Sequence, residues 1–407
     1  MDDNKTNATA TAAAATSVAA AATAAVAAAA AVTSAETNAL AYESFDKLEA
    51  FMRDVFIKVG VPEEDAAICA EILIESDKRG IDSHGVGRFK PIYIDRIKEG
   101  IQNPVTEFEI VKEGPTTAVV DGHDGMGHVI GKRSMQMAID KAKAYGMGMV
   151  TVRNSTHYGI AGYYATMATE AGMIGITGTN ARPSIAPTFG VENMLGTNPL
   201  TVGAPTDEDF PFILDCATSV SQRGKIEHYD RIGKTMPEGW VIRSDGSSEL
   251  DPAAALIGFG KGTHALVPVG GIGDETAGYK GYGYATVVEI LSASLQQGRF
   301  LKALNGVGEN GATIPYGLGH FFIAIDVNAF VELDKFKHTT GEILRELRAS
   351  ARMPGRERIY TAGELEYLAW LERKETGVPL NESLKKILAG LREEYELWDY
   401  KFSFAKA

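Results

Sequence analysis

The sequence predicts an α/β protein, in which helices cover a central sheet. Strand patterns and helix patterns alternate through the middle of the chain, and largely helical patterns flank this region on both sides. The 407 residues, 45% of them hydrophobic, are enough to bury a large core in two or three domains, or in one domain with insertions. We predict four segments, over 1–41, 42–120, 121–330 and 331–407, of which the last packs back on the second.

The first segment, 1–41, is rich in alanine and threonine, with few charges and no glycine or proline. Asp2 and Asp3 stand where a signal peptide has basic residues, and the segment lacks the arginines of a transit peptide. We interpret it as a low-complexity tail outside the fold, with a cryptic targeting signal as the alternative.

The segment 42–120 begins with helical periodicity. Apolar residues recur at three-to-four spacing over 45–56, and a second helix is predicted to follow 61–64 and to pack against the first. Glycine and polar residues at 80–85 interrupt the pattern before a further helix. His84 is therefore expected near a helix start.

Short apolar runs alternate with amphipathic stretches in the middle of the chain. Strands are predicted over 118–120, 149–152, 174–178, 200–202, 212–214 and 320–325, and helices over 129–145, 160–171 and 283–295. Beyond residue 333 the pattern is largely helical, with breaks near 353–355 and 377–379.

Composition excludes several classes of protein. The formal net charge of -13, with no block of Lys and Arg, argues against a nucleic-acid partner. After the tail, no apolar run is long enough to span a bilayer, so we predict no membrane partner. The two cysteines, Cys69 and Cys216, lie far apart and in no metal-binding spacing. A reducing compartment, the cytoplasm, fits this pattern.

The dinucleotide-binding fingerprint G-x-G-x-x-G is absent, although the chain contains 44 glycines. The nearest segments, 122–127 and 278–283, have the wrong spacing. Spacing alone therefore argues against a nicotinamide enzyme of the usual type.

A histidine and an arginine lie one helical turn apart in the segment Ser83-His84-Gly85-Val86-Gly87-Arg88. Residues at this spacing share one side of a helix. An arginine can bind a carboxylate in bidentate fashion while a histidine exchanges a proton with the adjacent oxygen, so the pair suits a hydroxy or oxo acid. A capping or structural histidine and a solvated helix arginine are the alternatives.

His157 lies in a polar turn, 154–159, directly after a predicted strand. Loops at strand ends often carry active residues, and a helix-capping network in the same turn is the competing interpretation. His123 and His128 flank a glycine-rich turn, but no third ligand stands at a recognisable spacing, so we predict no metal site.

Two segments have the composition of cofactor-binding loops. Small and amide residues at 178–183 and 196–199 lie next to predicted strands and could offer backbone N–H groups to a phosphate or ribose. Lys280 could place a cation on a pyrophosphate. Ordinary turns and a surface lysine explain the same residues.

Six motifs, taken together and in order, resemble the type-2 malate/L-lactate dehydrogenase family over about Tyr42 to Leu391. The motifs are Ser83-His84-Gly85-Val86-Gly87-Arg88-Phe89, Asn154-Ser155-Thr156-His157-Tyr158-Gly159, Gly196-Thr197-Asn198-Pro199, Asp215-Cys216-Ala217-Thr218-Ser219, Pro237-Glu238-Gly239-Trp240 and Gly278-Tyr279-Lys280-Gly281-Tyr282-Gly283. Several motifs in the right order are far more specific than any one of them.

The resemblance implies a nicotinamide cofactor, NAD with NADP as the alternative, held over 121–330 by a sheet without Rossmann topology. The absence of Rossmann topology explains the missing fingerprint. The resemblance also implies a homodimer with its site near the subunit boundary. It also implies that Ser83 and Arg88 bind the substrate and that His84 or His157 exchanges the proton. The residues expected along the cofactor are Ala181, Phe212, Ile213, Leu214, Asp215, Cys216, Ala217, Lys280, Pro354 and Gly355.

The predicted function is hydride transfer between NAD(H) and a small 2-hydroxy or 2-oxo acid, most directly malate or lactate. Ureidoglycolate, sulfolactate, diketogulonate and cyclic imino acids are alternatives within the family, and a catalytically silent dinucleotide-binding protein is the alternative outside it. Two departures from the family pattern affect the cofactor contacts: the link 272–277 is longer than usual, and Arg356 follows Gly355 where an acidic residue or histidine is more familiar.

Overall fold

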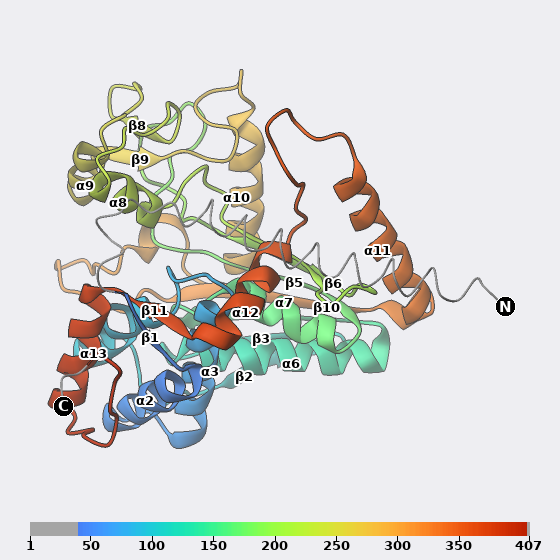
Figure 1. Ribbon diagram of the computed structural model, residues 1–407, viewed down its shortest axis with the longest axis horizontal. Helices are drawn as coiled ribbons and strands as arrows, with labels where there is room; N and C mark the ends of the chain where they lie inside the picture. The colour runs from blue at the N-terminus through green and yellow to red at the C-terminus, as the bar shows by residue number, and fades with distance from the viewer. Residues whose placement is uncertain (1–39, 405–407) are drawn as a thin grey trace.

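The computed structural model describes residues 40–404, and it confirms the α/β class (Figure 1). The predicted tail lies outside the described residues as far as residue 39. Its last predicted residue, Ala41, already belongs to a strand, β1 (Ala41–Glu43).

A mixed sheet of seven strands forms the centre of the molecule, in the order β2-β3-β4-β10-β5-β6-β7. The strands are β2 (Glu109–Glu113), β3 (Thr117–Asp121), β4 (Met147–Ser155), β5 (Met173–Thr179), β6 (Leu200–Ala204), β7 (Phe212–Cys216) and β10 (Leu318–Asp326). Only β3 and β4 run parallel among these neighbours, whereas a Rossmann sheet is mostly parallel. The missing fingerprint is therefore consistent with the sheet that is found.

Helices cover both faces of this sheet. They are α6 (Gly127–Tyr145), α7 (Ala161–Glu170) and α10 (Gly278–Ala293). On one face, Phe322 of β10 packs against Tyr164 of α7. On the other face, a Cβ at Gly319 would lie 1.7 Å from the Ser292 carbonyl oxygen, so glycine is what lets α10 pack this closely.

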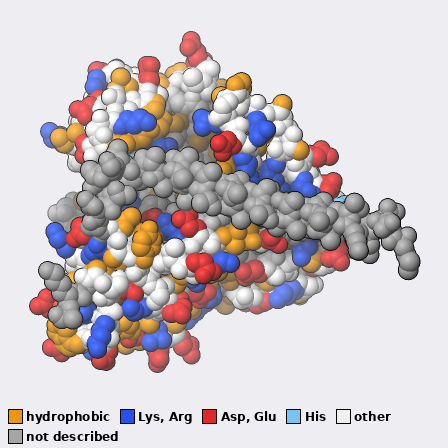
Figure 2. Space-filling view, in the orientation of Figure 1, with side chains coloured by type: hydrophobic (Ala, Val, Ile, Leu, Met, Phe, Trp, Pro, Cys, Tyr) orange, Lys and Arg blue, Asp and Glu red, His pale blue; other side chains and the backbone are white. Residues whose placement is uncertain are grey.

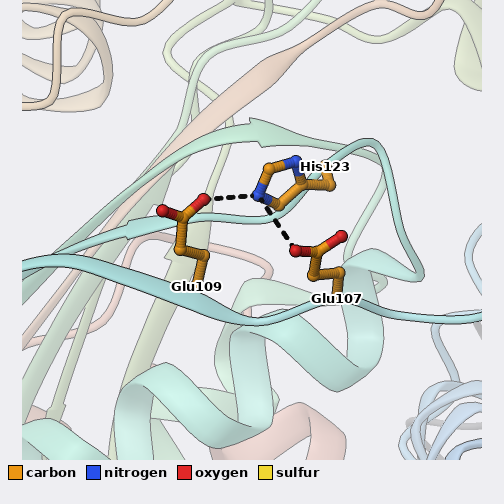
Figure 3. A group of neighbouring side chains, drawn as sticks. All are labelled: Glu107, Glu109 and His123. Carbon is orange, nitrogen blue, oxygen red and sulfur yellow. Dashed lines mark hydrogen bonds and ion pairs between the residues drawn. The ribbon is translucent and has the colours of Figure 1, made fainter.

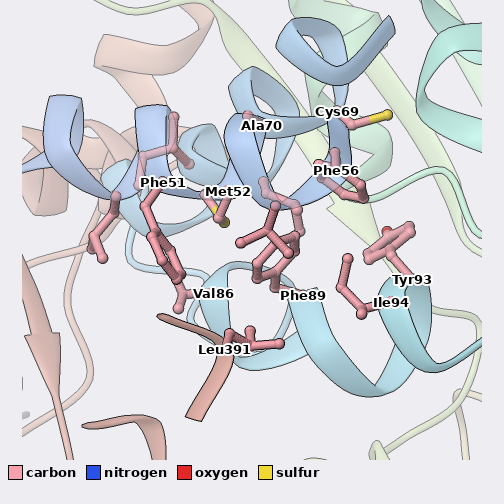
Figure 4. Close-up of a cluster of buried hydrophobic side chains, with 14 of the residues drawn as sticks. Phe51, Met52, Phe56, Cys69, Ala70, Val86, Phe89, Tyr93, Ile94 and Leu391 are labelled. Atoms are coloured by element: carbon pink, nitrogen blue, oxygen red, sulfur yellow. The ribbon is translucent and has the colours of Figure 1, made fainter. Parts of the chain in front are cut away.

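The two ends of the described chain share one core. Strand β1 pairs with β11 (Val378–Leu380), and the helices around them are α2 (Phe45–Lys58), α3 (Glu63–Lys78), α12 (Glu364–Thr376) and α13 (Glu382–Glu394). Figure 4 shows Phe51, Met52 and Phe89 packed in this core with Leu391 of α13. The predicted packing of α2 against α3 is confirmed.

A smaller lobe stands on one side of the sheet and contains its own apolar cluster (Figure 1). It consists of α8 (Arg223–Arg231), α9 (Pro252–Lys261), β8 (Val241–Arg243) and β9 (His264–Leu266). Helix α11 (Leu333–Ala349) extends away from the sheet and buries only Gly341 and Leu344. Two short 3₁₀ turns, η2 (Leu301–Leu304) and η3 (Val327–Ala329), complete the connections outside the N-terminal helices.

The differences from the predicted elements have local causes. Strand β2 was not predicted because all five of its residues are exposed, so its sequence carries no buried alternation. The predicted helix 283–295 begins at Gly278 instead, since four glycine or tyrosine residues in its first turns resemble a loop. Strands β1, β8, β9 and β11 have three residues each, too few to show a period.

Acidic and basic side chains are interspersed on the face shown in Figure 2. Among the helices of residues 40–404, none has both the length and the apolar composition needed to cross a membrane.

Candidate active site

His84 is held by a loop anchored to α3. The carboxylate of Asp77 accepts the Val86 N–H at 2.8 Å, which fixes the start of α4 (Val86–Arg88) two residues after His84. A Cβ at Gly85 would lie 2.1 Å from the Asp77 carboxylate, so only glycine fits there. The predicted position of His84 near a helix start is confirmed.

The other two residues of this motif support the same loop. Ser83 Oγ lies 2.9 Å from Nδ1 of His84. The Nε–H of Arg88 donates to the Ser83 carbonyl oxygen at 2.6 Å, which leaves the terminal N–H groups of the guanidinium for a ligand. Ser83, His84 and Arg88 therefore form one cluster.

His157 follows β4 in a turn whose preceding residues, Asn154 and Thr156, are hydrogen-bonded to neighbouring segments. Asn154 adopts a φ of 50°, which asparagine tolerates better than most residues, and its amide donates to both carboxylate oxygens of Asp121 at 3.0 and 2.9 Å. Thr156 Oγ1 accepts the Gly127 N–H at 3.0 Å, at the start of α6. The capping role weighed for this turn thus falls to Thr156, and His157 stays available.

A buried tyrosine hydroxyl connects two histidines. Tyr93 Oη lies 2.6 Å from Nδ1 of His157 and 2.9 Å from Nε2 of His128. The Gly159 nitrogen also lies 3.2 Å from Nδ1 of His157. Because Nδ1 is occupied in this way, Nε2 is the ring nitrogen of His157 that can meet a substrate. The ring of His84 stacks on His157 at a centroid distance of 5.8 Å and an angle of 21°.

Tyr93 owes its position to a π-helical turn, η1 (Phe89–Ile94), between α4 and α5 (Asp95–Lys98). Pro91 lies inside this turn and has no N–H, so it cannot make the regular i→i−4 hydrogen bond of an α-helix. The wider turn brings Tyr93 into full burial between the two histidines.

Burial and neighbouring cations keep these histidines neutral. Burial, with Arg88 adding to it, lowers the pKa of His84 to about 4, and burial lowers the pKa of His128 to about 3. Burial also holds the pKa of His157 well below 6.5, and the nearby histidines and arginines lower it further. His157 is therefore unprotonated and able to accept a proton at neutral pH.

A cavity of about 320 Å³ opens beside His157. It is lined by Arg96, His157, Ala181, Arg182, Pro183, Ser184, Asn193, Thr197, Arg223, Phe259, Leu266, Tyr316 and Leu318. This lining contains three arginines and no carboxylate, which suits an anionic ligand. Ser83, His84 and Arg88 are not part of this lining, and they adjoin it through the ring of His84, which stacks on that of His157.

Only some of the residues expected along the cofactor lie at this cavity. Ala181 lines it. Ala217 lies next to it, because the hydroxyl of the following residue, Thr218, donates to the carbonyl of Thr197 in the lining at 3.0 Å. The other end of β7 differs: Ile213 and Asp215 face a second cavity, of about 360 Å³, between α3, α7 and α12.

Of the remaining expected residues, Phe212, Leu214 and Cys216 occupy the opposite face of strand β7 from Ile213 and Asp215. Lys280 is exposed in the first turn of α10. Pro354 and Gly355 are exposed in the connection between α11 and α12.

The start of α10 has the chemistry that a dinucleotide phosphate needs. No side chain caps this helix at Ala277, and the ammonium group of Lys280 lies exposed beside it. Free N–H groups at a helix start together with a cation favour a phosphate. The Val269 N–H donates to the Thr218 carbonyl at 2.8 Å, which connects the loop before α10 to the edge of the His157 cavity. The residues present therefore fit a nicotinamide dinucleotide.

Sequence reasoning missed Tyr93, Arg96 and Tyr316 as site residues and weighed His128 only as a metal ligand. Arg96 follows Arg88 by eight residues, a spacing of about two helical turns that could have drawn attention to it. Tyr316 arrives from a distant loop, and its local sequence carries no signal.

A second group of titratable residues lies on the exposed edge of the sheet (Figure 3). Nε2 of His123 lies 2.7 Å from a carboxylate oxygen of Glu109 and 3.8 Å from one of Glu107. The hydrogen bond to Glu109 raises the pKa of His123, so an ion pair accounts for the arrangement.

Comparison with known proteins gives consistent matches. The sequence pattern of the family described as malate/L-lactate dehydrogenase matches residues 44–389. A malate dehydrogenase of Pyrococcus horikoshii is 44% identical over 348 residues, which is 86% of this chain and 93% of the relative. An L-sulfolactate dehydrogenase of Methanocaldococcus jannaschii is 40% identical over 84% of this chain and 94% of the relative.

A more distant relative and a solved structure extend these matches. A ureidoglycolate dehydrogenase (NAD(+)) of Escherichia coli K12 is 30% identical over 79% of this chain and 87% of the relative. The crystal structure of a malate dehydrogenase from Entamoeba histolytica has a TM-score of 0.85 and 46% identity, and covers 88% of this chain and 99% of that chain.

Proposed function

This chain belongs to the malate/L-lactate dehydrogenase family, whose members oxidise hydroxy acids, and on that premise we propose that it interconverts malate and oxaloacetate with NAD(H). The observation that carries the proposal is the cavity in which His157 lies among arginines with no carboxylate. Two relatives named malate dehydrogenase, at 44% and 46% identity, support the substrate. The NAD(+) in the name of the E. coli relative supports the cofactor, with NADP as the alternative.

The chemistry divides between cofactor and protein. Bound NAD(H) supplies or accepts the hydride. Nε2 of His157 exchanges a proton with the oxygen on C2 of the substrate, because Nδ1 faces Tyr93: in the base form the ring hydrogen is on Nδ1 and donates to Tyr93 Oη, which leaves Nε2 unprotonated. Arg88 binds the C1 carboxylate, which orients C2. The substrate's negative charge offsets the arginines that lower the pKa of His157, so the proton taken from malate is more stable in the complex than in the free enzyme.

Between the two candidate histidines, we assign the proton exchange to His157. His157 lines the cavity and has a hydrogen-bond chain on its far nitrogen, and His84 does not line the cavity. His84 packs against the ring of His157, and Ser83 and Arg88 complete the substrate side of the cluster.

The cofactor residues and the oligomer remain part of this proposal. We assign Ala181, the run from Phe212 to Ala217, Lys280 and the Pro354–Gly355 turn to the dinucleotide, as the family resemblance implies.

A homodimer is supported by an apolar row on α10, where Tyr284, Val287 and Ile290 are about half exposed at three-residue spacing. Light scattering of the purified protein tests it, and a monomer at micromolar concentration would refute it. A cytoplasmic location remains a prediction from the sequence.

The test compares the turnover of several 2-oxo acids with NADH and with NADPH. Turnover is monitored by the absorbance of the reduced nicotinamide. We expect the highest kcat/KM for oxaloacetate with NADH. Sulfopyruvate is the second candidate, since the sulfolactate dehydrogenase relative is 40% identical and its substrate also carries two acid groups. Pyruvate and glyoxylate, with ureidoglycolate and NAD in the oxidative direction, cover the remaining family substrates. A folded protein that turns over none of them would contradict the proposal.

A further inference from the structure

Two arginines lie against one aromatic ring in the His157 cavity. The guanidinium carbon of Arg96 lies 4.7 Å from the centroid of the Tyr316 ring, and that of Arg182 lies 5.3 Å from it. Arg96 comes from α5, Arg182 from the loop after β5, and Tyr316 from the loop before β10. Three distant parts of the chain thus place two positive charges together beside the reacting histidine.

Neither arginine has an anionic partner in the described part of the chain. Both contact Tyr316, but within residues 40–404 neither guanidinium group makes an ion pair or a hydrogen bond, and no cavity-lining residue is acidic. Burial lowers the pKa of the Arg96 guanidinium, and repulsion from Arg182 acts in the same direction. Arg96 is partly buried and Arg182 is exposed at the mouth of the cavity. A partly buried cation without a partner is costly, and a second cation beside it adds repulsion, so an anion that binds to both is favoured.

We propose that Arg96 and Arg182 form an anion subsite for the second acid group of the substrate, so that the enzyme selects doubly charged 2-hydroxy acids over singly charged ones. Arg88 takes the carboxylate next to the reacting carbon, and the pair at Tyr316 takes the carboxylate or sulfonate at the other end. The inference deepens the proposed function and rests on it. It makes Arg96 and Arg182 specificity-determining residues.

The test compares two substrates of equal chain length. Oxaloacetate and 2-oxobutyrate both have four carbons, and only oxaloacetate carries a second carboxylate. At saturating NADH, we expect Arg182→Gln to lower kcat/KM for oxaloacetate by about 10- to 150-fold, the range for a lost charged hydrogen bond. We expect the value for 2-oxobutyrate to change by less than about threefold.

Two further variants make the result interpretable. Arg231→Gln removes the same charge from an exposed position at the end of α8, outside the cavity, and should leave both substrates unchanged. Arg96→Lys keeps the charge at the more buried position and should cost part of the oxaloacetate preference, because lysine lacks the planar fork of arginine. An equal loss for both substrates in Arg182→Gln, or a raised KM for NADH alone, would overturn the inference.

A binding measurement separates this inference from the proposed function. Malonate carries two carboxylates and no reducible carbonyl, and acetate carries one. Calorimetry should detect malonate binding to the wild-type protein and at least tenfold weaker binding to Arg182→Gln, with no such difference for acetate. If the wild type binds malonate in this way but turns over no oxaloacetate, the subsite stands and the malate assignment fails. Equal malonate binding by wild type and variant rejects the subsite.

Discussion

The imidazole of His157 has one nitrogen that faces Tyr93 and another that faces the cavity. The hydroxyl of Tyr93 has a single proton, so it can donate to one histidine and must accept from the other. Nε2 of His157 can accept a proton only in the tautomer that carries its hydrogen on Nδ1, so in the base form Nδ1–H donates to Tyr93 Oη and the Tyr93 hydroxyl donates to Nε2 of His128. The orientation of the reacting ring is thus fixed before substrate binds.

Replacing His157 tests its role directly. His157→Asn should lower kcat for malate oxidation by about 10²- to 10⁴-fold, with little change in KM, because proton exchange is lost while Arg88 remains. The control His228→Asn changes a histidine on α8, outside the cavity, and should keep normal turnover. A His157→Asn enzyme with wild-type kcat would exclude His157 as the acid/base.

The pH dependence of malate oxidation follows from the lowered pKa of His157. The active form for oxidation is the unprotonated base, which is present above its pKa, so a lowered pKa extends activity toward acid. We expect kcat/KM to stay level from pH 8 down to pH 6.5 and to fall only below it. A decline of kcat/KM with its midpoint above pH 6.5 would show that burial and the arginines do not lower the pKa of His157 in the free enzyme.

At the scale of elements, the site depends on how closely the start of α6 approaches the turn after β4. A Cβ at Gly127 would lie 2.4 Å from the Thr156 carbonyl oxygen and 2.5 Å from that of His157. Backbone occupies this space, so neither partner can move without displacing His157. The glycine is therefore a requirement of packing as well as of the helix start.

The Gly127→Ala variant should lose both stability and activity. Overpacking at this contact should cost about 1–3 kcal/mol of unfolding free energy and reduce kcat as His157 shifts. Gly260→Ala is the matched control, since a Cβ on that helical glycine of α9 meets nothing within 4 Å. It should raise stability by up to about 1 kcal/mol through better helix propensity. Urea denaturation and turnover of both variants decide the point, and a fully active, stable Gly127→Ala would refute the close contact.

At the scale of the whole molecule, the first and last helices of the described chain stabilise each other. Leu391 of α13 is 1% exposed in the core formed mainly by α2 and α3 (Figure 4). The C-terminal helix is therefore part of the N-terminal core, which also supports the π-helical turn that carries Tyr93.

Truncating Leu391 measures this dependence. Leu391→Ala should lower the unfolding free energy by about 2–5 kcal/mol, the range for a buried leucine, as read from urea denaturation. Leu365→Ala on α12 removes a side chain that is 55% exposed and should change stability by no more than about 0.5 kcal/mol. Equal effects of the two substitutions would contradict the shared core.

The sequence was informative where periodicity is long and local. The alternation over 118–178 predicted the sheet class, and spacing predicted the pair of His84 and Arg88. The family resemblance implied that Ser83 and His157 belong to the same site. The order of the strands could not be predicted from the sequence, because β10 lies between β4 and β5 although more than a hundred residues separate it from either. Tyr316 was missed as a site residue for the same reason. It contacts Arg96 and Arg182, which come from distant segments, and such contacts leave no local pattern in the sequence.

The place of β10 also bears on how the protein is made. Strands β4 and β5 leave the ribosome long before residue 318, and during that interval each lacks one of its two neighbours in the finished sheet. Their inner edges, with unpaired N–H and C=O groups, then have to stay apart from other chains. We expect newly synthesised chains to depend on chaperones until β10 emerges, and refolding of the complete chain to be slow, because its central pairing joins distant residues.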